Sequence, residues 1–283
     1  MAITLGKRAS KNLADALAYA LLVFVGLLIL LPLYWMVSTS LKDPSELFLI
    51  PPVWIPNPLR WENYREALTT LPFGRFALNT SIITVVSVIG QLLSSPLVAY
   101  SFARLRFRGK NGLFMLILAT MMLPAQVTMI PVFIMFKSFG WLDTFIPLTL
   151  PHFFGSAYFI FLLRQFMLTI PPELGDAAKI DGCGYFGTFS RIFMPLSKAA
   201  LATVAIFTFT WSWNDFMGPV IYLNTREKWT LAVGLRGFIA SYGTTRFHLL
   251  MAASLVTVLP CVVLYFFAQR LFIQGIVITG IKG

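Results

Sequence analysis

Long apolar stretches separated by short polar segments are the main pattern along this chain. Six uncharged windows are each long enough to cross about 30 Å of hydrocarbon as an α-helix. A transmembrane β-barrel would instead show short segments of alternating apolar and polar residues. The pattern therefore predicts an all-α polytopic membrane protein with six transmembrane helices, near Ala16–Val37, Leu78–Ala103, Leu113–Phe136, Thr144–Leu163, Ala199–Asn214 and Leu249–Gln269.

The composition agrees with this prediction. The chain is 58% hydrophobic and 12% charged, with a mean hydropathy of +0.78, whereas about a quarter of the residues in soluble domains are charged. The first window is longer than a signal-peptide core and lacks a small-residue cleavage site, so we expect a retained anchor. The predicted organisation is an N-terminal segment (1–15), a six-span domain (16–270) and a C-terminal tail (271–283).

The net charge of +11 would also fit a nucleic-acid-binding protein, but the positions of the charges indicate membrane topology instead. Arg104, Arg106, Arg108 and Lys110 crowd the short loop between the second and third windows. Because short basic loops stay in the cytoplasm, both termini are predicted to be cytoplasmic. Residues 38–76 then form an external segment, rich in Pro and Trp, in which Trp61–Leu68 is predicted to be an amphipathic helix.

A charged, helix-forming segment lies in the predicted cytoplasmic loop 169–198. Pro171-Pro172 suits a helix start, and Glu173 and Asp176 are expected in the first turn, where negative charge is favourable. Gly182 and Gly184 are expected to end this helix. One apolar side is predicted, formed by Leu174, Ala177, Ala178 and Ile180.

A second amphipathic helix is predicted directly after it, ending at Pro195. Its apolar face is expected to contain Tyr185, Phe186, Phe189, Ile192 and Phe193. A pair of polar helices between membrane spans has no use in contact with lipid. We therefore expect loop 169–198 to dock on a cytoplasmic partner.

The spacing within this loop resembles the EAA motif of ABC importer permeases. That motif has Glu-Ala-Ala, three residues, Gly, nine residues and Ile-x-Leu-Pro; here Asp replaces the leading Glu and Met194 replaces Leu. The matching residues are Asp176-Ala177-Ala178, Gly182, Ile192 and Pro195. Trp213-Asn214-Asp215-Phe216, Gly140–Thr144 and the Lys282-Gly283 ending extend the resemblance to the carbohydrate-uptake branch, in particular to the shorter permease of maltose-type importers.

The resemblance implies the type I importer permease fold in the inner or cell membrane of a bacterium or archaeon. It also implies a second, homologous permease subunit, two cytoplasmic ATPase subunits and an extracytoplasmic solute-binding protein. The residues implied to couple to the ATPase are Glu173, Asp176, Ala177, Ala178, Asp181, Gly182, Ile192 and Pro195. Whether Glu173 or Asp176 makes the main ATPase contact is left open.

Catalytic signatures are absent from the sequence. It lacks the phosphate-binding pattern Gly-x-x-x-x-Gly-Lys-Ser/Thr, any nucleophile–base constellation, and any Cys or His spacing typical of a metal site. We expect a non-catalytic subunit that binds no cofactor and no nucleic acid, with ATP and Mg²⁺ held by the partner ATPase.

A candidate substrate path lies at the end of the fifth window, where aromatic faces and polar groups of the kind that suit sugars occur together. The candidate residues are Trp211, Trp213, Asn214 and Asp215, with Gln126 from the third window. An interfacial aromatic belt explains the same residues equally well. The functional alternative is an ion-coupled secondary transporter or channel subunit, and sugar, polyol and sugar phosphate all remain open as substrates.

Overall fold

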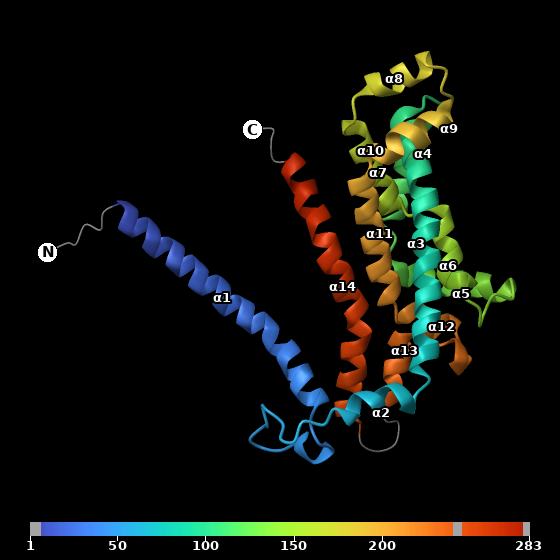
Figure 1. The fold of residues 1–283 in the computed structure, drawn as a ribbon. Helices are drawn as coiled ribbons and strands as arrows, with labels where there is room; N and C mark the ends of the chain where they lie inside the picture. The colour runs from blue at the N-terminus through green and yellow to red at the C-terminus, as the bar shows by residue number, and fades with distance from the viewer. Residues whose placement is uncertain (1–6, 240–244, 280–283) are drawn as a thin grey trace. The chain divides into compact units, whose positions relative to one another are not determined.

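The computed structural model describes residues 7–239 and 245–279, and every regular element within those ranges is a helix (Figure 1). This confirms the predicted all-α fold class. The chain divides into two compact units. The first unit comprises Met1–Leu71 and Gly237–Thr257, and the second comprises Pro72–Arg236 and Val258–Gly283.

The apolar windows coincide with long helical segments. Among the described residues, four helical segments are long and apolar enough to cross a membrane, namely Lys11–Ser40, Phe73–Arg104, Ile146–Thr169 and Phe247–Gln269. The other two windows lie in helix pairs that are bent at a short break, Lys110–Thr120 with Ala125–Ser138 and Tyr185–Leu196 with Lys198–Trp213. Counting each pair as one span gives six.

The third window differs most from the uninterrupted helix that its apolar length predicts. It forms α4 (Lys110–Thr120) and α5 (Ala125–Ser138), which meet at an angle of 96°. Pro124 is extended and precedes α5 directly. Because proline has no N–H and disfavours helical geometry in the residue before it, a helix cannot run through residues 121–124 unchanged.

The first unit contains α1 (Lys7–Ser40), η1 (Pro44–Glu46), α2 (Glu62–Thr70) and the first part of α14 (Phe247–Thr279). The predicted external helix is confirmed as α2. Its buried Asn63 donates from Nδ2 to the carbonyls of Ser40 and Lys42, at 2.9 Å each, and so joins α2 to the end of α1. Lys42 is 1% exposed and lies 3.9 Å above the ring of Trp35; burial lowers its pKa.

The second unit is built around α3 (Phe73–Arg104), which packs against α7 (Ala157–Thr169) and α11 (Lys198–Trp213). Its main core is formed by apolar residues of these three helices and of residues 189–193. The remaining elements are α6 (Ile146–Thr149), η2 (Leu150–Phe154), α8 (Pro172–Ile180), α9 (Tyr185–Thr188), η3 (Phe189–Phe193), α10 (Met194–Leu196), α12 (Met217–Tyr222), η4 (Arg226–Lys228), α13 (Leu231–Leu235) and η5 (Arg236–Phe238), which continues into the first unit.

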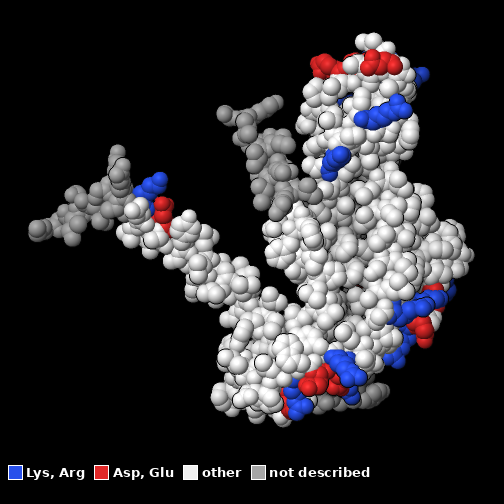
Figure 2. Space-filling model, viewed as in Figure 1, with Lys and Arg blue, Asp and Glu red and all other residues white. Residues whose placement is uncertain are grey.

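Charged residues of the second unit gather toward its two ends on the face drawn in Figure 2, with an uncharged band between them. One end carries α8 and the loop Arg104–Lys110 after α3, and the other carries the start of α3, where Asn79 donates to the carbonyl of Glu227 in η4 and Lys228 of η4 pairs with Asp143. An uncharged band between charged ends is the arrangement expected of helices that cross a bilayer.

Candidate functional site

Helix α8 forms the outermost element at one end of the second unit (Figure 1). It begins at Pro172, with Glu173 in its first turn, and Asp181 follows its last residue. Gly182 has a φ of +81°, which glycine adopts without strain, so the predicted helix end is confirmed. Asp176 lies in the second turn, one residue too far along for the first-turn position predicted for it.

Four residues of α8 face inward, toward the rest of the second unit. Pro172, Gly175, Asp176 and Lys179 line a pocket of about 530 Å³. Their spacing of three, four and seven residues places them on one face of a helix. Ala178 is 4% exposed and lies beside this face, so it contacts the rest of the unit.

The outward face of α8 is exposed and partly apolar. It carries Glu173, Leu174, Ala177 and Ile180, and the side chain of Ile180 is 87% exposed. The single apolar side predicted to include Ala178 is therefore wrong, since Ala178 is buried and the other three residues are exposed. Exposed apolar side chains at a polar end of a protein mark an interaction surface.

The two carboxylates left open by the sequence lie in different surroundings. Asp176 accepts a hydrogen bond from Lys179 at 3.0 Å, on the inward face. Glu173 lies on the outward face and makes no ion pair with any described residue. Asp181 is exposed at the end of α8. Glu173 and Asp181 are thus exposed without an ion pair among the described residues, whereas Asp176 is exposed but paired with Lys179.

The segment after α8 is helical, but only part of its predicted apolar face is buried. Phe189 and Phe193 pack on Tyr100 of α3, with ring centroids 5.3 and 5.1 Å apart, whereas Tyr185 and Phe186 are exposed. Only the part of the predicted face in the π-helix η3 packs on the core, and the part in α9 (Tyr185–Thr188) that carries Tyr185 and Phe186 does not. Ile192 is half-buried beside the core.

The helix predicted to end at Pro195 ends one residue later, at Leu196, and the chain bends by 79° before Lys198. Proline is tolerated in the first turn of a helix, where its missing N–H is not needed. The bend leads directly into α11.

Arg104 and Arg164 hold this end of the unit together, although their sequence positions predicted no such contacts. Arg104 donates from Nη2 to the carbonyls of Met167, at 2.5 Å, and Ile170, and its guanidinium lies 4.9 Å from the centroid of the Phe193 ring. Arg164 donates from Nε to the carbonyl of Phe102 at 3.1 Å. Helices α3 and α7 and the π-helix are thereby joined behind α8. No pattern in the sequence distinguishes these arginines from other basic residues.

The candidate path residues do not form one cluster. Trp211 stacks on Phe159 at 5.3 Å, and Trp213 stacks on Phe209 at 5.3 Å, so the two indoles lie on different sides of α11. Gln126 is exposed at the start of α5. Their role as a substrate path stays a prediction.

Asp215 and Asn214 connect α11 to its neighbours. The carboxylate of Asp215 accepts a hydrogen bond from the N–H of Gly218 at 3.1 Å, at the start of α12. Asn214 donates from Nδ2 to the carbonyl of Thr210 at 2.8 Å and lies 3.8 Å from Sγ of Cys261. These contacts give both residues a structural role in the turn between α11 and α12.

Comparison with known proteins identifies relatives that span almost the whole chain. The chain is 35% identical to the sn-glycerol-3-phosphate transport system permease protein UgpE of Yersinia pestis, over 93% of this chain and 96% of that protein. It is 33% identical to the arabinooligosaccharides transport system permease protein AraQ of Halalkalibacterium halodurans, over 92% of this chain and 94% of that protein.

A solved structure has the same fold. A chain of a bacterial ABC transporter involved in the import of the acidic polysaccharide alginate matches with a TM-score of 0.82 at 24% identity, over 95% of this chain and 99% of that chain. The family described as the binding-protein-dependent transport system inner membrane component matches residues 95–278, which include α8 and its surroundings. The resemblance to ABC importer permeases is confirmed, and the chain belongs to the family of binding-protein-dependent transport system inner membrane components.

Proposed function

We propose that this chain is a permease subunit of an ATP-driven importer, and that the outward face of α8 receives the motion of a cytoplasmic ATPase. The observation that carries the proposal is the exposure of Ile180 and its apolar neighbours beside the unpaired carboxylate of Glu173. An apolar surface with carboxylates at its edges, Glu173 and Asp181, suits a cleft that has an apolar floor and a basic rim.

The surroundings of α8 support transmission of force into the membrane-spanning helices. Phe193, packed against Tyr100 and Arg104, links the segment after α8 to α3. Shifting a transport cavity between two conformations, from a population ratio of 1:99 to 99:1, requires a partner that binds one conformation about 5.5 kcal/mol more tightly than the other. A packed helix end can transmit work of this size, because packed interfaces resist continuous deformation.

The proposed complex contains a second permease subunit, two ATPase subunits that bind ATP and Mg²⁺, and an extracytoplasmic solute-binding protein. A solved structure of a bacterial alginate ABC transporter, in complex with a periplasmic protein bound to an alginate pentasaccharide, supports the last of these partners. In this arrangement the chain itself is non-catalytic. Both of its termini, with α8, lie on the cytoplasmic side, as the basic loop Arg104–Lys110 indicates.

The proposed substrate class is a carbohydrate or a polyol phosphate. The relatives are named for sn-glycerol-3-phosphate and for arabinooligosaccharides, which share a chain or ring of neighbouring hydroxyl groups. Trp211, Trp213, Asn214, Asp215 and Gln126 are the proposed path residues, because aromatic faces and polar groups together suit such molecules.

The test replaces Ile180 with lysine. Because that side chain is 87% exposed, Ile180→Lys should leave the chain folded and inserted but greatly reduce co-purification of the ATPase and ATP-dependent uptake. Ile55→Lys, at an apolar residue that is 75% exposed in the external segment, is the matched control and should retain the ATPase. Normal uptake by Ile180→Lys would refute the coupling role of α8.

A further inference from the structure

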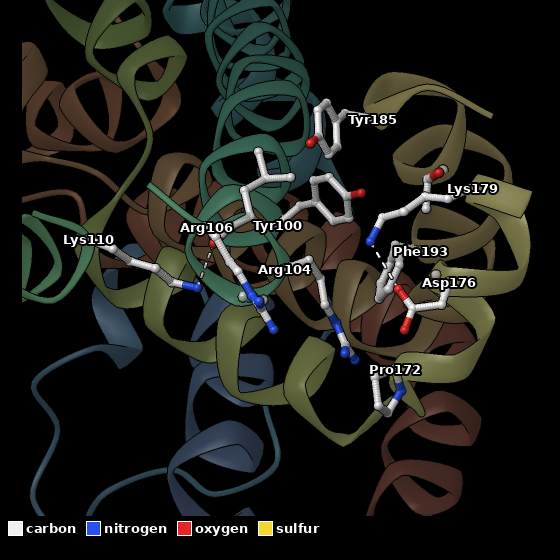
Figure 3. A pocket seen from close by; sticks show the side chains of 13 residues that line it. Tyr100, Arg104, Arg106, Lys110, Pro172, Asp176, Lys179, Tyr185 and Phe193 are labelled. Atoms are coloured by element: carbon white, nitrogen blue, oxygen red, sulfur yellow. Dashed lines mark hydrogen bonds and ion pairs between the residues drawn. The ribbon is translucent and has the colours of Figure 1, made fainter. Parts of the chain in front are cut away.

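The pocket behind α8 is lined by more positive than negative side chains (Figure 3). Arg104 comes from the end of α3, Arg106 from the following loop, Lys110 from the start of α4 and Lys179 from α8. Asp176 is the one carboxylate among the lining residues. The volume of about 530 Å³ accommodates a small anion or a lipid headgroup.

The charges in this pocket are incompletely balanced. Asp176 and Lys179 neutralise each other at 3.0 Å. Arg104, Arg106 and Lys110 make no ion pair with any described residue, and Nε of Arg104 is buried without a hydrogen-bond partner. Three neighbouring cations repel one another, so an anion between them lowers the electrostatic free energy.

The donors lie next to one another. In Figure 3 the guanidinium groups of Arg104 and Arg106 point in the same direction and the ammonium group of Lys110 points toward Arg106. Nη2 of Arg104 is already bonded to the carbonyls of Met167 and Ile170, so Arg106 and Lys110 are the main donors available to an occupant. Lys110 donates one hydrogen bond, to the carbonyl of Leu105 at 2.9 Å, which leaves it two further N–H donors. Arginine forks and lysine ammonium groups are the side chains that proteins use to bind phosphate groups.

The pocket lies on the inward side of α8, away from the face proposed for the ATPase. Pro172, Gly175, Asp176 and Lys179 line it, whereas Ile180 and Glu173 lie on the outward face. An occupant of the pocket would therefore touch α3, α4 and α8 together without occupying the docking surface.

We propose that this pocket binds a phosphate group, carried either by an acidic phospholipid headgroup or by a soluble phosphorylated compound. The bound phosphate bridges the loop Arg104–Lys110 to α8 and stabilises the position of α8. An effect of the bound phosphate on coupling to the ATPase rests on the proposed function of α8. The binding of phosphate in the pocket does not rest on it.

The test for a lipid source is native mass spectrometry of the intact importer, purified from membranes that contain phosphatidylglycerol and phosphatidylcholine. The wild-type chain should retain phosphatidylglycerol selectively. Arg106→Ala combined with Lys110→Ala should reduce retention about tenfold or more, because two charge-assisted donors to the phosphate are lost. Arg108→Ala, in the same loop but outside this pocket, should change retention less than about twofold.

The test for a soluble source uses the delipidated complex in a neutral detergent. Inorganic phosphate should raise the unfolding temperature saturably compared with chloride at equal ionic strength, and the double variant should lose this rise. Lys110→Arg keeps the positive charge. This variant should bind the same source of phosphate as the wild type, lipid or soluble, in contrast to the double variant. Equal lipid retention by the double variant and Arg108→Ala, together with no response to phosphate, would overturn the proposal. Lipid retention and the unfolding temperature are both measured without ATP. They therefore test the phosphate site even if α8 does not couple to an ATPase.

Discussion

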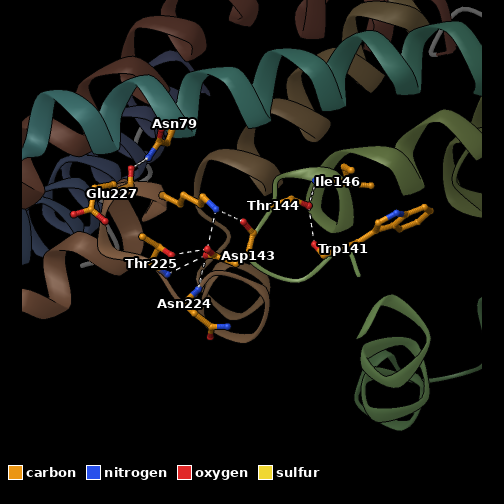
Figure 4. A network of polar contacts seen from close by, with 9 residues as sticks. Asn79, Trp141, Asp143, Thr144, Ile146, Asn224, Thr225 and Glu227 are labelled. Carbon is orange, nitrogen blue, oxygen red and sulfur yellow. Dashed lines mark hydrogen bonds and ion pairs between the residues drawn. The ribbon is translucent and has the colours of Figure 1, made fainter. Parts of the chain in front are cut away.

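The ammonium group of Lys228 donates hydrogen bonds to both the backbone carbonyl and the carboxylate of Asp143, at 2.5 and 2.8 Å (Figure 4). The same carboxylate accepts hydrogen bonds from the N–H groups of Asn224 and Thr225, at 3.0 and 2.9 Å. Asp143 thus joins the loop before α6 to the loop after α12, at the end of the second unit opposite α8. Its φ of +55° is unusual for a residue other than glycine, although aspartate is among the residues that tolerate it.

Replacing Asp143 with alanine should destabilise the second unit by about 1–3 kcal/mol, because the hydrogen bonds to a charged acceptor are lost together. Thr225→Val removes one of these hydrogen bonds, from Oγ1 of Thr225 to Asp143, and should have a smaller effect. The measurement is the midpoint of thermal unfolding of the purified chain in detergent. Equal midpoints for wild type and Asp143→Ala would show that the two loops are held by other contacts.

The same carboxylate should make stability depend on pH. The hydrogen bonds from Lys228 and Thr225 hold the pKa of Asp143 well below its usual range. A carboxyl group with a lowered pKa contributes its full stabilisation above its unfolded pKa of about 3.9, and this contribution is lost as pH falls from there through the folded pKa. Unfolding midpoints measured from pH 7 down to about pH 2 should therefore fall further for the wild type than for Asp143→Asn, with most of the difference below about pH 3.9.

Asp43 does not confound this comparison. Its pKa is also lowered, because the backbone N–H and hydroxyl of Ser45 donate to its carboxylate, and both proteins retain it. Identical pH profiles for the wild type and Asp143→Asn would contradict the assignment to Asp143.

Arg104→Lys should loosen the segment behind α8 although it keeps the charge. Nη2 of Arg104 donates to both Met167 and Ile170 while the planar guanidinium lies over the Phe193 ring, and a lysine ammonium does not reproduce this combination. Hydrogen–deuterium exchange should increase in peptides covering residues 163–170 and 189–193. Arg108→Lys, at an exposed position in the adjacent loop, is the control and should leave exchange unchanged.

Gly234→Ala tests the close approach of α13 to α3. A Cβ atom at Gly234 would lie 2.4 Å from Cδ2 of Phe76, whose side chain is fully buried, so overpacking should cost about 1–3 kcal/mol. Gly112→Ala in α4 is the matched control, since nothing lies within 4 Å of its Cβ position. That change should be neutral or stabilise by up to about 1 kcal/mol. Equal thermal midpoints for the two variants would contradict the packing.

The sequence was sufficient for features that depend on local chemistry. Among the described residues, apolar length located the four long apolar helical segments and the two bent helix pairs, and the conformational freedom of Gly182 located the end of α8. The bend of 96° before α5 was not predicted, because the length of an apolar window does not indicate the direction in which its helix runs. Pro124 signalled a disturbance there without fixing its angle.

Features that depend on tertiary contacts could not be predicted. Asp143 and Lys228 are 85 residues apart, and no pattern in the sequence pairs them. Asp176 lines the pocket behind α8 and Glu173 does not, and no pattern in the sequence indicates which face of α8 packs inward. The apolar face of residues 185–193 was overestimated because Tyr185 and Phe186 fit the apolar pattern but lie exposed in α9, and the pattern does not show where the core ends.

The most direct test of the account is cysteine cross-linking of α8 to the ATPase in the assembled importer. Cys183 and Cys261 are first replaced by serine, and single cysteines are then placed along residues 172–180. The account predicts cross-links from positions 173, 177 and 180 and none from positions 175, 176 and 179. Cross-links confined to 175, 176 and 179, or none at any position in an assembled complex, would contradict the assignment of the outward face of α8 as the coupling surface.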